Sequence, residues 1–306
     1  MNITLENTAV IVPTYQAGKH ADALVEALKL QPIHPSQVLV IDSSSTDGST
    51  QIFRNFGARV VVIPQKNFNH GGTRRYATEL EPEREFYVFL TQDCIPRPDA
   101  LLRLVSSFEE SSVGMSYGRQ LPVPHARAIE RHARLFNYPP RSEIRDLSDR
   151  ARMGVKSTFC SDSFAAYRSE ALSAIGGFPE DAYFGEDQIL GGRMLLSGWK
   201  LAYCADAEGI HSHAYSLRQE FQRYFDVGVF HARNTWLLQK FGAAEGEGLK
   251  FVISELKYLI RHEPLSIPSA ITRTFVKYAG YKLGQMESKL SLQMKKKLSA
   301  NPSYWK

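Results

Sequence analysis

The sequence is poor in the features that define several common protein classes. Its three cysteines, Cys94, Cys160 and Cys204, lie far apart among 306 residues and form no C-x-x-C pair, which argues against a disulfide framework and against a cysteine-built zinc site. No run of about 18 uncharged apolar residues is present, so an ordinary membrane-spanning helix is not expected. Residues 1–5 lack the pattern of a secretory signal. We therefore expect a cytoplasmic protein that at most rests on the inner face of the cell membrane.

Negative charge is scarce in one part of the chain. Residues 216–306 contain 15 Lys and Arg but only 7 Asp and Glu, a net charge of +8, whereas residues 1–215 contain 22 and 25, a net charge of −3. Hydrophobic residues make up 43% of the chain, which is ample for a folded core. The positive C-terminal third predicts an anionic partner, such as a membrane surface, a lipid-linked phosphate or nucleic acid.

Short apolar runs alternate with helical patterns in the first hundred residues. The apolar runs predict strands at residues 8–13, 38–42, 59–63 and 86–90. Helical spacing predicts helices between them, at residues 21–30, 50–56 and 71–80. This alternation predicts an α/β fold with a parallel sheet covered on both faces. In such sheets, ligands bind beyond the carboxyl ends of the strands.

The pattern changes in the second half of the chain and becomes helical near its end. We expect helices at residues 126–137, 169–175 and 186–197, a strand at 200–204 and a last long helix at 271–298. The stretch 216–242 is also helical in pattern, and Ser216 with Gln219 matches a capping box at its start. We therefore expect two units, an α/β domain at residues 1–215 and a basic helical extension at residues 216–306.

Several acidic side chains follow predicted strands directly. A carboxylate at Asp42 or Asp47 could accept a hydrogen bond from a base or a ribose, although both positions also suit ordinary turn chemistry. Asp93 follows the strand at 86–90 and could hold a hard divalent cation beside a diphosphate, or could cap the next helix. Asp99 is better placed for that cap, which favours a functional interpretation of Asp93.

Other candidate groups lie at predicted helix starts and after the strand at 200–204. Glu186 and Asp187 begin a predicted helix, and the helix dipole alone can explain acidic residues there. In the functional interpretation, the same dipole keeps Asp187 ionised so that it can act as a general base. His211 and His213 share one face of an extended segment and are either metal ligands or ordinary histidines. Residues 70–75, His-Gly-Gly-Thr-Arg-Arg, would stabilise an anion at a helix start. They form neither a P-loop nor G-x-G-x-x-G, so a dinucleotide-binding dehydrogenase is disfavoured.

The order of these motifs resembles the family 2 inverting glycosyltransferases with the GT-A fold. The resemblance covers about residues 6–230 and rests on segments 10–15, 40–49, 69–74, 90–93, 175–178 and 184–187, followed by His211. The variants His-Gly-Gly-Thr-Arg, Thr-Gln-Asp and His-Ser-His-Ala-Tyr-Ser, with residues 223–228 after them, look like the bacterial rhamnosyltransferase branch. That branch uses dTDP-L-rhamnose to build surface polysaccharides such as O-antigen.

The resemblance implies a role for each candidate residue. The nucleotide sugar would be bound by Pro13, Thr14, Tyr15, Asp42, Asp47, Gly72, Arg74, Gln92 and Asp93. Within that set, Asp42 would contact the base and Arg74 would add a cation near the phosphates. Asp93 would hold Mg²⁺ or Mn²⁺ with His211, and His213 is the alternative ligand; Thr91 replaces the first Asp of the family's Asp-x-Asp motif, which leaves fewer anionic ligands. Asp187 would be the catalytic base, with Glu186 as its supporting neighbour.

The implied reaction is the inverting transfer of a sugar, L-rhamnose from dTDP-rhamnose, to a hydroxyl of a surface polysaccharide or lipid-linked glycan. A UDP-sugar donor is one alternative, and a nucleotidyltransferase that makes sugar nucleotides is another, although residues 13–19 lack its Gly-rich activation loop. A nucleic-acid-binding protein is disfavoured, because acidic strand ends repel phosphates unless a metal is present.

The many aromatic residues of the extension have two interpretations. They could form a basic, aromatic face on an anionic membrane, with residues 295–297, Tyr304 and Trp305 as the best local contact. They could equally belong to a helical cap that buries them against the catalytic domain.

Overall fold

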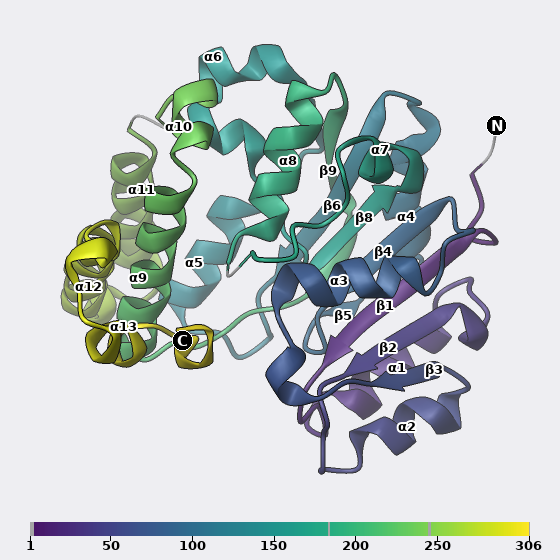
Figure 1. Ribbon diagram of the computed structural model, residues 1–306. Coiled ribbons are helices and arrows are strands. Elements are labelled where there is room, and N and C mark those ends of the chain that lie inside the picture. Colours follow the sequence, from purple (N-terminus) through teal and green to yellow (C-terminus); the bar gives the residue numbers. More distant parts are fainter. Residues whose placement is uncertain (1–2, 183, 244–245, 306) are drawn as a thin grey trace.

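Figure 1 shows the computed structural model, which describes residues 3–182, 184–243 and 246–305. An α/β part with a twisted sheet occupies one side of the molecule, and helices of the C-terminal third stand together on the other side. Met1 and Asn2, the first residues of the segment expected to carry no secretory signal, lie outside the described residues, as does Lys306.

Nine strands within the described ranges form one mixed sheet, in the order β3-β2-β1-β4-β8-β6-β9-β5, with β7 paired to β9. The strands are β1 Thr8–Thr14, β2 Val38–Asp42, β3 Arg59–Val62, β4 Phe86–Leu90, β5 Ile95–Pro96, β6 Val113–Leu121, β7 Glu143–Arg145, β8 Phe164–Arg168 and β9 Lys200–Ile210. The first four strands are parallel, which confirms that part of the prediction. β8 is antiparallel to β4 and β6, because its first residue, Phe164, pairs with Leu90 at the end of β4 and the strand runs back from there.

Helices cover both faces of the sheet, as expected, and each face has its own hydrophobic core. In β1, Ala9 and Ile11 point into one core, whereas Val10 and Val12 point into the other, as the period of two in a strand requires. The helices of this part are α1 Ala21–Lys29, α2 Ser49–Phe56, α3 His70–Glu79, α4 Ala100–Ser106, α5 Ala128–Asn137, α6 Arg150–Met153, α7 Ser169–Ala174 and α8 Glu186–Leu196. All predicted helices of this part are present within one or two residues of the expected ends.

The carboxyl ends of β1, β2, β4, β6 and β9 lie at the same edge of the sheet. β9 is longer than the predicted strand at 200–204, because it continues beside β6 until Ile210 pairs with Leu121. The His211 amide then donates to the Leu121 carbonyl at 2.9 Å. This extra pairing carries His211 and His213 to the edge where Asp93 follows β4.

The helical extension contains five α-helices within the residues that the structure describes. They are α9 Leu217–Arg233, α10 Thr235–Phe241, α11 Glu247–His262, α12 Ile267–Gln285 and α13 Leu292–Leu298. The capping box before α9 is confirmed, since Ser216 accepts from the Gln219 amide and Gln219 accepts from the Ser216 amide. The stretch expected as one helix from Ser216 to residue 242 is broken at Asn234, whose backbone leaves the helical region at φ −113° and ψ 49°.

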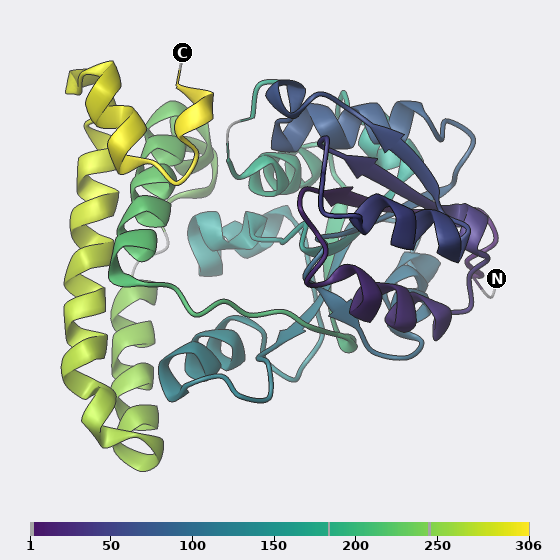
Figure 2. The same ribbon diagram turned by 90° about the horizontal axis from the view of Figure 1, so that it is seen from below.

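The last helix was also expected to be continuous and is not. α12 ends at Gln285, and Ser291 starts α13 by accepting a hydrogen bond from the Met294 amide. α9 and α12 run side by side (Figure 2) at very short range. A Cβ atom added to Gly284 would lie 2.0 Å from the Phe225 carbonyl oxygen, so this close packing requires glycine. No described helix combines the length and the apolar composition that crossing a membrane requires.

Candidate active site

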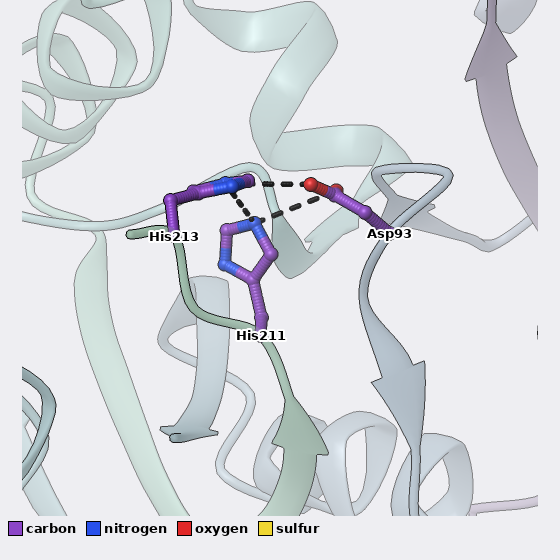
Figure 3. A group of neighbouring side chains, drawn as sticks. All are labelled: Asp93, His211 and His213. Atoms are coloured by element: carbon purple, nitrogen blue, oxygen red, sulfur yellow. Dashed lines mark hydrogen bonds and ion pairs between the residues drawn. The ribbon is translucent and has the colours of Figure 1, made fainter. Parts of the chain in front are cut away.

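Three predicted metal ligands, Asp93, His211 and His213, converge at the carboxyl edge of the sheet (Figure 3). The Nε2 atoms of His211 and His213 lie 3.4 and 3.3 Å from the two carboxylate oxygens of Asp93, and 3.0 Å from each other. All three ligand atoms therefore lie within 4.8 Å of one another. The spacing matches what a single cation between them needs.

The protonation of the three groups also suits a cation. Burial raises the pKa of Asp93, but the neighbouring imidazole of His211 outweighs this effect, and the pKa of Asp93 lies well below its usual range. Burial lowers the pKa of His211, and it lowers the pKa of His213 to about 4. One carboxylate and two neutral imidazoles are a donor set that suits a divalent ion such as Mn²⁺. The residues present thus fit the expected metal.

Gln120, on β6, orients His211 and was not found by sequence reasoning. Its Oε1 atom lies 2.8 Å from Nδ1 of His211 and also accepts from Nη1 of Arg134 at 2.6 Å. An amide oxygen only accepts, so Nδ1 of His211 carries the proton and Nε2 offers its lone pair toward Asp93. The contact depends on the pairing of β6 with β9, which has no signal in the sequence near Gln120.

Arg74, Glu186 and Asp162 form a second, buried cluster. Arg74 lies 2.9 Å from Glu186 and 3.1 Å from Asp162, and all three side chains are almost fully buried. The charge of Arg74 is taken up by these two carboxylates inside the protein, and its expected contact with phosphates stays a prediction. Asp162 was not predicted; burial raises its pKa to about 6 against the opposing effect of Arg74.

Asp187 lies beside this cluster at the start of α8. Its carboxylate accepts from the Gln188 amide at 2.7 Å and from the Asp162 amide at 3.3 Å. Burial, followed by the charges of Glu186 and Asp162, raises the pKa of Asp187 well above its usual value. The start of α8 was expected to keep Asp187 ionised. The hydrogen bond from the Gln188 amide does lower the pKa of Asp187, but less than burial and the two neighbouring charges raise it. A carboxylate with a raised pKa is a stronger proton acceptor, as general-base catalysis requires.

The loops after β1 and β2 hold two predicted nucleotide-binding residues internally. Asp42 is completely buried and accepts hydrogen bonds from the Thr14 hydroxyl, the Ser45 hydroxyl and the Ser45 amide, at 2.9, 2.6 and 2.8 Å. The Asp42 carboxylate is therefore enclosed by its own loops, and its expected contact with a base stays a prediction. Tyr15 remains exposed, and its backbone amide and carbonyl both bond to the side chain of Gln92.

The remaining predicted residues serve the local backbone. Asp47 accepts from the Gly18 amide at 2.7 Å and from Ser49, which is the turn chemistry that was the alternative for this position. The Gly72 amide donates to the Asn69 side chain that caps α3, at 2.6 Å. Pro13 lies in β1 opposite Ile41 of β2.

Arg223, on α9, is an exposed cation beside the metal candidate. Its guanidinium lies 4.9 Å from the centre of the Tyr215 ring, and that ring lies 5.2 Å from His213. Burial chiefly lowers the pKa of His211 and of His213, and the charge of Arg223 adds to this effect. In the described part of the chain, no ion pair joins Arg223 to a carboxylate. Its signal in the sequence was the segment 223–228 of the resemblance.

With the fold and the site in place, the comparison with known proteins defines the class. Residues 9–176 match the model of glycosyl transferase family 2, more than half of the chain. The chain belongs to this family, and it is a glycosyltransferase. The mostly parallel sheet with a helical C-terminal region is the GT-A architecture that the resemblance implied.

Individual relatives narrow the comparison. The chain is 45% identical to the O-antigen chain rhamnosyltransferase WbaN of Salmonella anatum, covering 97% of this chain and 95% of that protein. It is 41% identical to the O-antigen chain rhamnosyltransferase RfbN of Salmonella typhimurium, covering 100% and 96%. Its fold is similar to that of the mannosyltransferase PcManGT of Pyrobaculum calidifontis, solved with GDP-Man and Mn²⁺, at 17% identity and a TM-score of 0.57, covering 98% and 84%.

Proposed function

We propose that this protein transfers L-rhamnose from dTDP-rhamnose to a hydroxyl of an O-antigen or other lipid-linked glycan, with inversion at the anomeric carbon. The similarity to two O-antigen chain rhamnosyltransferases over nearly the whole chain supports the sugar and the product class. The observation that carries the chemistry is the meeting of Asp93, His211 and His213 at the carboxyl edge of the sheet. In this proposal residues 1–215 are the catalytic domain, and the enzyme works in the cytoplasm.

Asp187 is the general base of the proposed reaction. Its two oxygens are fixed by the Gln188 and Asp162 amides, so the carboxylate has one orientation toward the acceptor. It removes the proton from the acceptor hydroxyl as that oxygen attacks the anomeric carbon from the face opposite the diphosphate. A well-placed general base contributes about 10²–10⁴-fold to the rate.

Glu186 and Asp162 support Asp187 by their charge. Both are held by Arg74, which keeps the two carboxylates apart in fixed positions. Their negative charges raise the pKa of Asp187 after the effect of burial. In this proposal Arg74 acts on the base through these two carboxylates.

The diphosphate side of the site is served by Asp93, His211, His213 and Arg223. The first three would hold Mg²⁺ or Mn²⁺, which when bound neutralises charge on the departing nucleotide diphosphate. Arg223 supplies the cation that Arg74 does not, since it is exposed beside His213 and has no carboxylate partner in the described ranges. Tyr15, whose backbone is hydrogen-bonded to the Gln92 side chain, offers its exposed ring to the nucleoside.

A thermal-shift screen of nucleotide sugars, with and without Mn²⁺, tests the donor. We expect dTDP-rhamnose to raise the melting temperature more than dTDP-glucose or UDP-glucose, and Mn²⁺ to increase the shift. A UDP-sugar donor is the second candidate, because thymine and uracil share the same hydrogen-bonding edge. A preference for a UDP-sugar would overturn the assignment of dTDP-rhamnose.

A further inference from the structure

The helical extension exposes apolar side chains along the hairpin formed by α11 and α12. We define the hairpin face by six of them: Leu249, Ile260, Leu265, Ile271, Phe275 and Tyr278. Leu265, in the turn between the helices, is 94% exposed, and Phe275 and Tyr278 are 69% and 62% exposed. Single exposed apolar residues are ordinary, but a row of large ones marks an interaction surface.

The geometry of the hairpin makes this row continuous. Ile271, Phe275 and Tyr278 are spaced at i, i+4 and i+7 and so share one side of α12. A shallow groove of about 180 Å³ between the helices is lined by Leu256 of α11 and by Ile271 and Phe275 of α12. Figure 2 shows α12 on the outer side of the molecule, away from the sheet, with α9 between them.

The charge around the hairpin face is predominantly positive, and the acid beside the turn, Glu263, is paired with Arg127. α12 and α13 contain no Asp or Glu at all. Of the two acids on α11, Glu247 is paired with Lys156 and Lys250, and Glu255 is buried. Lys257, Arg261 and Lys282 are exposed; helical spacing places Lys257 and Arg261 along the edge of the apolar row and Lys282 at its end, one turn after Tyr278.

Part of the segment expected to touch a membrane is packed within the extension. Trp305 is only 5% exposed and packs in a small core with Phe225, while Lys295 pairs with Glu287 at 2.7 Å. Trp305 and Lys295 thus pack within the extension, whereas Lys296 and Lys297 are exposed, so the expected membrane contact of residues 295–297, Tyr304 and Trp305 stays a prediction. Among the described residues of the extension, the most exposed large apolar side chains lie on the hairpin face.

We infer that the hairpin face docks on an anionic lipid bilayer, with its apolar side chains in the interfacial region and Lys257, Arg261 and Lys282 on lipid phosphates. The charge pattern favours this partner over a second copy of the chain. A self-complementary contact between two hairpin faces would bring cations against cations, whereas an anionic surface attracts them. The described helices do not cross a membrane, so the contact is peripheral.

Glu263 joins the hairpin to the catalytic domain by a hydrogen bond and an ion pair. Glu263, next to the hairpin turn, accepts from the Ala128 amide at 3.0 Å and pairs with Arg127 at 3.2 Å, both at the start of α5. The same helix carries Arg134, which reaches Gln120 beside His211. Docking would thus hold the active site at a fixed position relative to the bilayer, where a lipid-linked acceptor is found.

Vesicle co-sedimentation of the full chain tests this inference. The vesicles contain phosphatidylglycerol with phosphatidylethanolamine, or phosphatidylcholine alone as the neutral comparison. We expect binding to the anionic vesicles only, weakened by high salt. The variant Leu265→Ser with Phe275→Ser should bind at least about tenfold more weakly, given the apolar area removed. Leu30→Ser is the matched control, because Leu30 is 59% exposed at the end of α1 and outside the hairpin face.

Three results would overturn the inference. The first is a failure of the wild-type chain to bind anionic vesicles, and the second is unchanged binding of the double variant. The third is a dimer in sedimentation velocity that the double variant abolishes, which would make the hairpin face a contact between two copies. Sugar transfer to a water-soluble acceptor is measured on the same preparations, so that a failure of the proposed function is seen separately from a failure of membrane binding.

Discussion

Replacing Arg74 by methionine should strongly destabilise the protein. The guanidinium lies 2.9 Å from Glu186 and 3.1 Å from Asp162, so the substitution leaves two buried carboxylates without their counter-charge. Breaking a buried ion pair in this way costs about 3–5 kcal/mol of unfolding free energy. Arg75→Met is the matched control, because Arg75 is only half-buried, pairs with two exposed glutamates and otherwise donates only to the Gly176 and Phe178 carbonyls, at 3.3 and 3.4 Å. Such surface pairs contribute about 0–1 kcal/mol.

The loss in Arg74→Met should also depend on pH. Burial already raises the pKa of Asp162 to about 6 in the presence of Arg74, and without that cation the pKa rises further. A carboxyl with a higher pKa in the folded state binds more protons there than in the unfolded state. Stability therefore falls as the pH increases from about 4 through the folded-state pKa. The destabilisation should be smaller near about pH 5 than near about pH 8.

Urea unfolding followed by tryptophan fluorescence at both pH values measures these differences. The variant is expected to lose several times more unfolding free energy than Arg75→Met at the higher pH. Equal losses in the two variants, or a loss in Arg74→Met that does not change with pH, would show that Arg74 does not balance two buried charges.

The other predictions concern the metal and the reaction. Gln120→Leu removes the acceptor that orients His211 and should weaken Mn²⁺ binding about 10–100-fold in isothermal titration calorimetry; unchanged affinity would remove its positioning role. Arg223→Gln should weaken binding of the nucleotide-sugar donor about tenfold or more, as loss of a charge-assisted contact does, whereas Arg218→Gln, an exposed change on the same helix, should not. Glu186→Gln removes a charge that raises the pKa of Asp187, so the acidic limb of the kcat/KM profile should move to lower pH; a limb that stays in place would argue against Asp187 as the titrating base.

Much of the fold could be predicted because its signals are local. The apolar runs of β1, β2 and β4, and the capping box of Ser216 and Gln219, depend on neighbouring residues in the sequence. The direction of β8 and the full length of β9 could not be predicted, because they depend on pairing with strands far away in the sequence. Both breaks in the C-terminal helices fall in polar segments that a helical pattern tolerates.

Only part of the candidate site could be predicted from the sequence, because burial by distant parts of the chain decides which side chains can reach a ligand. Asp93, His211 and His213 were identified from their positions after strands, and the structure brings them together. Asp42 and Arg74 look equally suited to a ligand in the sequence, but tertiary contacts enclose both of them. Asp162 and Gln120 have no motif, since their importance comes from the partners that the fold places beside them.

Transfer by the Asp187→Asn variant tests the central claim most directly. The amide keeps the size of the side chain but cannot accept the proton from the acceptor hydroxyl. With dTDP-rhamnose, Mn²⁺ and a glycan acceptor, we expect dTDP release to fall at least about 100-fold. The thermal shift caused by the donor should remain that of the wild-type protein. Transfer at the wild-type rate, or loss of donor binding together with activity, would contradict the assignment of Asp187 as the base.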